Sequence, residues 1–133
     1  MIIGIGNDLI NIDRIAEILE QHDDRFIKRC FTDAEIEKAE SRRETGTHIE
    51  AYAKRFAAKE ACAKALGTGI RDGIYLRDIG VITDEHGRPS LVLTDGALKQ
   101  LEKMTPDGKK ASIHLSLTDE PPMAQAFVVI EVI

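Results

Sequence analysis

The sequence predicts an α+β fold in which an antiparallel sheet packs on one long central helix. Residues 49–66 contain no Pro or Gly and are dominated by Ala, Glu, Lys and Leu, a composition that favours helix. Apolar segments typical of strands lie at the N-terminus and again after residue 78. Two of the later segments flank a turn marked by Gly and Pro, which predicts a hairpin and hence antiparallel pairing.

Length and composition are those of one globular domain spanning residues 1–133. A chain of 133 residues is large enough to bury a core without disulfides. It is 43% hydrophobic and 31% charged, as expected for a soluble protein. The net charge of -5 argues against nucleic acid as a main partner, because such binding depends on a basic surface.

The sequence also predicts a cytoplasmic protein with no membrane partner. The N-terminus opens directly as a strand, without the basic segment and long apolar core of a signal peptide. No apolar run approaches the roughly 20 residues that span a bilayer. Cys30 and Cys62 are far apart and fit neither a CxxC motif nor a zinc spacing, so we expect neither a disulfide framework nor a structural metal.

Residues 1–8 are predicted to form a buried strand. Gly4 and Gly6 resemble the start of a dinucleotide-binding fingerprint, but Leu9 stands where the third glycine belongs and no helix opens at the glycines. Asp8 ends the predicted strand, a position from which its carboxylate would project into a cleft. The alternative is that Asp8 only caps the turn or helix that follows.

The next segment is predicted to be a helix with a basic face. Its apolar stripe consists of Ile15, Ile18 and Leu19. Arg25, Lys28 and Arg29 follow at i, i+3 and i+4, so on a helix they share one side. This face is either ordinary solvated surface or a docking site for an acidic protein.

A second, shorter helix is predicted from Thr32 to about Ser41, because Thr32 and Glu35 have capping-box spacing. The polar residues 42–48 then form a loop before the central helix. Gly67 supplies the left-handed residue that commonly closes a helix.

The second half of the chain is predicted to be mostly strands. Residues 78–83 and 90–94 form the hairpin, and residues 95–104 form a short helix capped by Thr94 or Asp95. Residues 113–118 alternate between apolar and polar, whereas residues 124–132 are almost continuously apolar and are expected to form a central strand. His114, on the alternating strand, is either a partly buried strand histidine or a ligand-binding residue.

The central helix carries an acid on its apolar stripe. That stripe consists of Ile49, Tyr52, Phe56, Glu60 and Ala63. Burying a lone carboxylate is costly, so Glu60 should be neutralised, paired or bound to a metal. Lys59 and Lys64 flank it, and the alternative is that Glu60 and Lys64 form a solvated i, i+4 pair.

Four segments together resemble the two signature blocks of the 4'-phosphopantetheinyl transferase superfamily. They are Gly4–Leu9, Ile12–Ile15, Arg55–Ala61 and Lys64–Gly69. The similarity extends to the turn Asp84–Pro89 and the strand His114–Thr118, and it covers nearly the whole chain. The short, single-unit length resembles the holo-[acyl-carrier-protein] synthase type, and the resemblance implies the fold of this superfamily.

The resemblance implies a reaction. Members move the phosphopantetheine arm of coenzyme A to a serine of apo acyl carrier protein, releasing 3',5'-ADP, and the single-unit type serves fatty acid biosynthesis. By this resemblance Asp8 and Glu60 are ligands of Mg²⁺, and Lys64 contacts the same phosphates. Mg²⁺ takes one or two carboxylates together with phosphate oxygens and waters, so two acids suffice. We predict that Glu60, directly or through a metal-bound water, accepts the serine proton.

The resemblance also implies the coenzyme A site. Its residues are Arg55, Phe56, Lys59, Lys64, Gly67, Thr68, Gly69, Asp84, Gly87, Arg88, Pro89 and His114. Arg55 is expected to hold a phosphate bidentately, and Arg88 and His114 to face the 3'-phosphate or adenine. Asp119 and the following Pro121-Pro122 depart from the histidine-bearing pattern of some members, which leaves the role of that strand end open.

The partners implied are an acidic carrier protein and further copies of this chain. Arg14, Arg25, Lys28 and Arg29 are expected to dock the carrier protein. A single unit also resembles the homotrimeric members, whose nucleotide sites lie between neighbouring subunits. Two other functions remain open: a Mg²⁺-dependent nucleotide phosphohydrolase, and a non-catalytic oligomer that binds coenzyme A or nucleotides.

Overall fold

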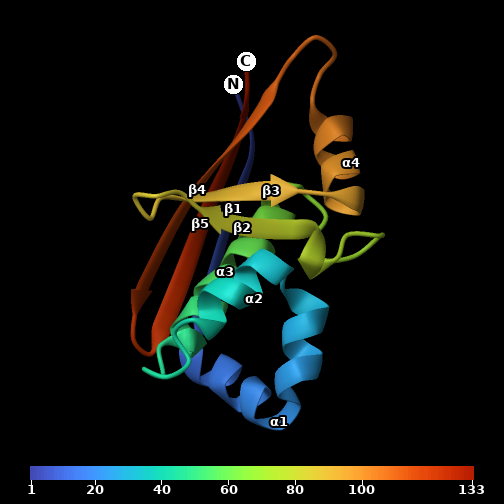
Figure 1. The fold of residues 1–133 in the computed structure, drawn as a ribbon. Helices are drawn as coiled ribbons and strands as arrows, with labels where there is room; N and C mark the ends of the chain where they lie inside the picture. The colour runs from blue at the N-terminus through green and yellow to red at the C-terminus, as the bar shows by residue number, and fades with distance from the viewer.

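The computed structural model describes all 133 residues. Its elements, in chain order, are β1 (Ile2–Asn11), α1 (Ile12–Cys30), α2 (Asp33–Glu40), α3 (His48–Ala65), the 3₁₀ turn η1 (Leu76–Asp78), β2 (Ile79–Thr83), β3 (Pro89–Leu93), α4 (Asp95–Met104), β4 (Ala111–Glu120) and β5 (Met123–Val132) (Figure 1). The predicted α+β architecture with a long central helix is confirmed. No helix is both long and apolar enough to cross a membrane.

The strands form two antiparallel sheets, a division that the sequence did not predict. One sheet has the order β1-β5-β4, and the other is the β2-β3 hairpin. The last strand, β5, is central in the larger sheet, as predicted. Helix α3 lies against β1 and β5, and the two chain ends lie together at one end of the sheet (Figure 1).

The first strand differs from its prediction. It continues to Asn11 and is an edge strand, so α3 covers only one of its faces. On the other face Ile5 is 61% exposed and Leu9 is 60% exposed, and the prediction of a buried strand ending at Asp8 is therefore wrong. Asn11 caps α1 by accepting a hydrogen bond from the Asp13 N–H at 2.9 Å, so Asp8 is not the cap.

Two glycines let α3 pack directly on β1. A Cβ at Gly4 would lie 2.2 Å from the carbonyl oxygen of Ala65, and one at Gly6 would lie 1.8 Å from that of Ala61. Any side chain at these positions would push the helix away from the strand. The Gly-x-Gly pattern is thus explained by close packing of strand and helix.

Helix α3 is buried on almost every side. The three-stranded sheet, the hairpin, α1 and α2 all contact it, so the single apolar stripe predicted for it was too narrow. Most of its buried residues are alanines, at positions 51, 53, 57, 58, 61, 63 and 65. The predicted end of the helix is confirmed by Gly67, which has φ of 83°. The capping box of Thr32 and Glu35 is confirmed as well.

Candidate active site

The structure brings Asp8, Glu60 and Lys64 together where β1 meets α3. Asp8 lies in β1, two residues beyond Gly6 and on the same, helix-facing side of the strand. The Lys64 ammonium is 3.1 Å from Asp8 Oδ1 and donates to the Asn7 carbonyl oxygen at 3.0 Å. Lys64 is therefore paired with the strand carboxylate, and a solvated pair of Glu60 with Lys64 is not formed.

The electrostatics of this cluster favour an added cation. Burial, and then the charge of Asp8, raise the pKa of Glu60, while Lys64 lowers it. The Asp8 side chain is 17% exposed and that of Lys64 is 52% exposed, so the cluster is open to solvent on the lysine side. Two hard carboxylate ligands that repel each other fit Mg²⁺, which completes its shell with waters and phosphate oxygens. No third acid, histidine or cysteine joins the two.

Lys59 does not belong to this cluster. Its side chain is fully buried, and its ammonium is 2.7 Å from Glu35 Oε1. It also donates to the carbonyl oxygens of Leu76 at 3.0 Å and Ile79 at 2.6 Å. With no exposed surface and every N–H already bonded, Lys59 cannot contact coenzyme A, and its prediction as a nucleotide-binding residue is corrected to a structural one.

Arg55 and Phe56 also point into the protein. Arg55 is only 5% exposed, and its Nη1 donates to the Ala51 carbonyl oxygen at 3.0 Å. Burial lowers the pKa of Arg55, and its Nε has no hydrogen-bond partner. The Phe56 ring lies 5.9 Å from the Phe26 ring of α1. A phosphate can reach Arg55 only if the side chain turns outward, because so little of it is exposed.

The hairpin turn is held by Asp84. Its Oδ1 accepts hydrogen bonds from the backbone N–H groups of His86 at 2.8 Å and Arg88 at 2.9 Å. Gly87 has φ of 80°, a value that suits glycine in a tight turn. Arg88 is exposed, and Pro89 begins β3.

The remaining predicted coenzyme A residues are spread over the chain. The Gly67–Gly69 loop follows α3, and the turn at residues 84–88 projects from the other end of the hairpin (Figure 1). His114 is exposed on the sheet face turned away from α3, with Nε2 2.8 Å from Glu131 Oε1. One chain therefore does not bring His114 to the side of the sheet that carries Asp8.

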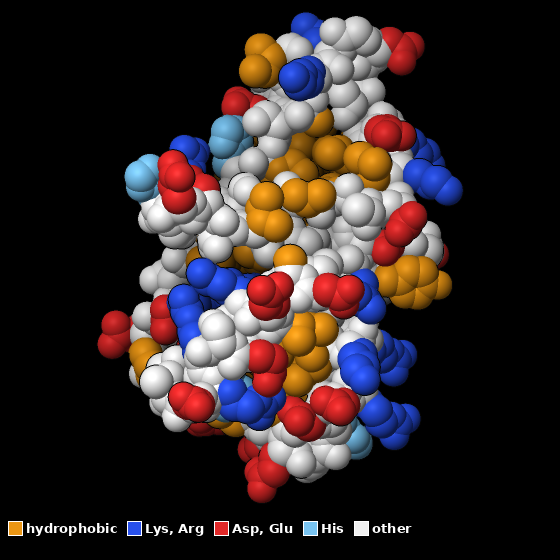
Figure 2. Space-filling model, in the orientation of Figure 1, with side chains coloured by type: hydrophobic (Ala, Val, Ile, Leu, Met, Phe, Trp, Pro, Cys, Tyr) orange, Lys and Arg blue, Asp and Glu red, His pale blue; other side chains and the backbone are white.

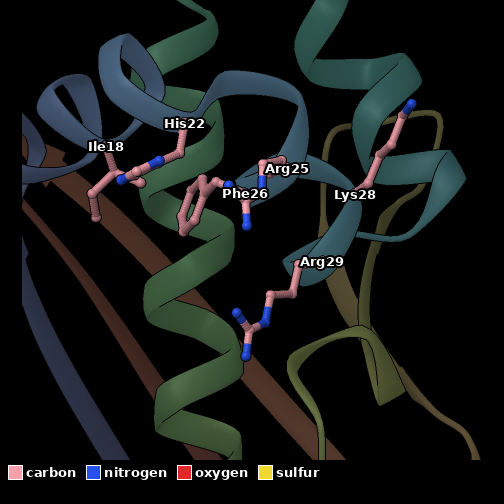
Figure 3. Close-up of a pocket in the computed structure, with 6 residues that line it drawn as sticks. All are labelled: Ile18, His22, Arg25, Phe26, Lys28 and Arg29. Atoms are coloured by element: carbon pink, nitrogen blue, oxygen red, sulfur yellow. The ribbon is translucent and has the colours of Figure 1, made fainter.

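A basic hollow of about 580 Å³ lies on α1. Its lining residues are Ile18, His22, Arg25, Phe26, Lys28 and Arg29, all from this one helix (Figure 3). Three of the four predicted docking cations line it, whereas Arg14 is exposed nearer the start of the helix. Lys and Arg side chains gather along the edge of the molecule beside α1 (Figure 2).

Three further residues line this hollow: His22 and Phe26, which were not predicted, and Ile18, which was predicted only as part of the apolar stripe. They follow one another at intervals of four, so on a helix they form a row beside the basic residues. This spacing of four was the pattern in the sequence from which the row could have been predicted.

Comparison with known proteins identifies the family. Residues 4–121 match the 4'-phosphopantetheinyl transferase superfamily. The chain is 59% identical over 134 residues to a holo-[acyl-carrier-protein] synthase of Rhodopseudomonas palustris, covering 100% of this chain and 92% of that protein.

Solved structures of similar proteins support the same family assignment. The holo-[acyl-carrier-protein] synthase of Neisseria meningitidis has a TM-score of 0.82 and 39% identity, covering 98% of this chain and 99% of that one. The Bacillus anthracis synthase, in complex with CoA (3',5'-ADP), has a TM-score of 0.77 and 34% identity, covering 98% and 97%. This chain belongs to the 4'-phosphopantetheinyl transferase superfamily.

Proposed function

We propose that this chain transfers 4'-phosphopantetheine from coenzyme A to a serine of apo acyl carrier protein, for fatty acid biosynthesis. The serine oxygen forms a bond to the phosphorus next to the pantetheine arm. The bond from that phosphorus to the oxygen of the leaving phosphate breaks, and 3',5'-ADP departs with the electron pair. The serine proton passes to a base on the enzyme.

The observation that carries the proposal is the cluster of Asp8, Glu60 and Lys64. Glu60 is the carboxylate of this cluster whose pKa is raised by burial and by Asp8 in the metal-free protein, and a carboxylate at this position can act as a general base. Glu60 accepts the serine proton, directly or through a bound water. The Lys64 ammonium, exposed beside it, holds phosphate oxygens and stabilises the charge of the leaving group.

We assign Asp8 and Glu60 as the ligands of Mg²⁺. When bound, this ion would offset part of the negative charge of the pyrophosphate and of the two carboxylates. The repulsion between Asp8 and Glu60 supports the assignment, because a divalent cation between them removes the unfavourable contact.

The carrier protein docks on α1. The hollow there combines a small apolar surface, from Ile18 and Phe26, with a basic rim of Arg25, Lys28 and Arg29. This combination is complementary to an acidic helix, and in a chain of net charge -5 it is a local excess of positive charge. Arg14 extends the same charge toward the start of the helix.

The active unit is a homotrimer with its coenzyme A sites between subunits. One face of the β1-β5-β4 sheet has no covering helix and exposes Ile5, Leu9 and Phe127. Exposed apolar patches of this kind mark interaction surfaces. Association through this face brings His114 of one chain toward the loops of its neighbour, and so accounts for a site whose residues are dispersed in one chain.

We place the reaction in the cytoplasm. Cys30 and Cys62 are both buried and unpaired, and unpaired cysteines are usual in a reducing compartment.

The test is the intact mass of purified apo acyl carrier protein after incubation with this protein, coenzyme A and Mg²⁺, beside a chelated control. The expected result is a metal-dependent gain of ~340 Da, the mass of one phosphopantetheine group. No gain, with coenzyme A consumed, would instead indicate a phosphohydrolase. Intact coenzyme A together with unmodified carrier protein would indicate a binding protein that does not catalyse the transfer.

A further inference from the structure

A buried ion pair lies beside the proposed active site and has no part in its chemistry. Glu35 of α2 and Lys59 of α3 are both fully buried, with Nζ and Oε1 2.7 Å apart. Lys59 directly precedes Glu60 in the chain. Placing two charges in a core costs free energy, and a well-packed apolar pair of the same volume is often equally stable or more so. Attraction between the two charges alone therefore does not explain why the pair is there.

The lysine is fully bonded. Its Nζ donates to Glu35 Oε1 at 2.7 Å, to the Leu76 carbonyl oxygen at 3.0 Å and to the Ile79 carbonyl oxygen at 2.6 Å. Three acceptors match the three N–H groups of an ammonium, so no N–H of a charged Lys59 is left without a partner. These bonds tie α3 to η1 and to the start of β2.

The glutamate is bonded on both oxygens. Besides Lys59, Oε1 accepts the Thr32 N–H at 2.8 Å, and Oε2 accepts the Val81 N–H at 2.9 Å. Glu35 therefore connects the start of α2 with β2. Through the pair, α3 is linked to three separate parts of the fold by hydrogen bonds, which have preferred directions that apolar contacts lack.

The pair lies on the opposite side of α3 from the glycine contact. Successive residues of a helix are about 100° apart, so Lys59 and Ala61 point in nearly opposite directions and Glu60 lies between them. The backbone carbonyl of Ala61 lies against Gly6 of β1, and the Lys59 ammonium lies against the start of β2. The direction of Glu60 is thus determined by these two contacts together.

We propose that the Glu35–Lys59 pair is a positioning device, which fixes the rotation of α3 about its axis and so holds Glu60 opposite Asp8. The alanine–glycine contact sets how closely the helix approaches β1, and the ion pair sets which way the helix faces. Lys59 and Glu35 are positioning residues, because they act through Glu60 without touching substrate. Two of the measurements described below, metal binding and transfer activity, rest on the proposed function.

The test is the double variant Glu35→Leu/Lys59→Met, which replaces the pair with apolar side chains. We expect it to unfold cooperatively but to be less stable than the parent protein, because the Thr32 and Val81 N–H groups and the Leu76 and Ile79 carbonyl oxygens lose their partners. Its affinity for Mn²⁺ alone, measured by electron paramagnetic resonance, should fall about tenfold, as when groups supporting metal ligands are removed. Residual dipolar couplings of the α3 amides should show a helix rotated relative to the sheet, and the transfer rate should fall with the Mn²⁺ affinity.

The control is Cys62→Ala, at a fully buried position almost one turn further along α3. It should lower stability through a cavity while leaving the Mn²⁺ affinity and the couplings unchanged. A folded double variant with the α3 couplings and Mn²⁺ affinity of the parent protein would overturn the proposal and leave the pair a structural contact only.

A third variant, Glu35→Gln, covers the case in which the double variant does not fold. It keeps the shape of the side chain but replaces one accepting oxygen with an NH₂ group, so either the bond from Val81 is lost or the two bonds from Lys59 and Thr32 are lost. It should rotate α3 in the same direction as the double variant does. If its α3 residual dipolar couplings equal those of the parent protein, the positioning role of the pair is contradicted. If the parent protein neither binds Mn²⁺ nor modifies the carrier protein, the proposed function fails, and the couplings alone still decide whether the pair positions the helix.

Discussion

Glu60 is the residue at which the proposed chemistry and the stability of the protein conflict. Burial and Asp8 raise its pKa in the folded chain above the unfolded value. The folded state then binds the proton more tightly than the unfolded state. The associated stability is complete below the unfolded pKa of about 4.3 and is lost as the pH rises through the folded pKa.

We therefore predict opposite effects of Glu60→Gln on stability and activity. The metal-free variant should melt at a higher temperature than the parent at pH 7, and the difference should vanish near pH 4. Transfer to the carrier protein should fall at least ~100-fold, because the base and a metal ligand are both lost. Glu37→Gln, at an exposed acid on α2, should change neither quantity. Near-normal turnover of Glu60→Gln with metal bound would show that Glu60 is not the base.

Gly6 is the residue that brings this site together. The substitution Gly6→Ala places a Cβ 1.8 Å from the Ala61 carbonyl oxygen, a backbone atom that can move only with the whole helix. We expect a loss of about 1–3 kcal/mol in the free energy of unfolding, measured by urea denaturation, together with reduced turnover. Gly80→Ala is the matched control, because its Cβ would meet only ordinary contacts, the nearest at 3.4 Å. Equal losses in the two variants would contradict the packing argument.

Individual site residues were predictable from the sequence only where a local pattern marked them. Asp8, Glu60 and Lys64 stand in recognisable motifs, and the structure brings them together. Lys59 stands in the same motif, yet its partner Glu35 is 24 residues away. A buried ion pair between distant residues leaves no periodic signal in the sequence, so nothing local distinguished Lys59 from Lys64.

Helix α1 is the element that we expect to recognise the carrier protein. Reversing the charge of two residues in its hollow, in the variant Arg25→Glu/Arg29→Glu, should raise the KM for carrier protein about tenfold or more. The KM for coenzyme A should stay unchanged, because the hollow lies on a different element from Lys64, the lysine that we propose holds the phosphates. Steady-state kinetics with each substrate varied in turn would measure both constants.

The control for this prediction makes the same change in net charge elsewhere. Lys109→Glu/Lys110→Glu alters two exposed lysines in the turn before β4 and should leave both constants near their parental values. If it raises the KM for carrier protein as much as the α1 variant does, overall charge, and not this hollow, governs docking.

Helices and strands were predicted well because local patterns determine them. The capping box at Thr32, the left-handed Gly67 and the alternation in β4 each depend on residues close in sequence. The exposure of β1 was not predictable in this way. Whether an apolar edge strand is covered on one face or two depends on which elements pack against it, and that is set by contacts between distant parts of the chain.

At the scale of the whole molecule, the outer face of the β1-β5-β4 sheet is the main surface left without a partner. Ile5, Leu9 and Phe127 lie on neighbouring strands there, and the register places Phe127 opposite Asn7, midway between Ile5 and Leu9. Burial of such a face contributes roughly 25 cal/mol for each Å² of apolar surface removed from water. Association of identical chains through this face is the simplest way to cover it.

We predict that Phe127→Glu separates the subunits and abolishes transfer. Light scattering should give the parent protein a mass three times the 14.7 kDa of one chain and the variant the mass of a single chain. The variant should keep its circular dichroism spectrum, because Phe127 is already 46% exposed in one chain. Val92→Glu is the matched control: Val92 has the same 46% exposure but lies on the hairpin, so this variant should remain trimeric and active. A monomeric Phe127→Glu protein with full activity would show that each chain holds a complete site, and the proposal of sites shared between subunits would then be wrong.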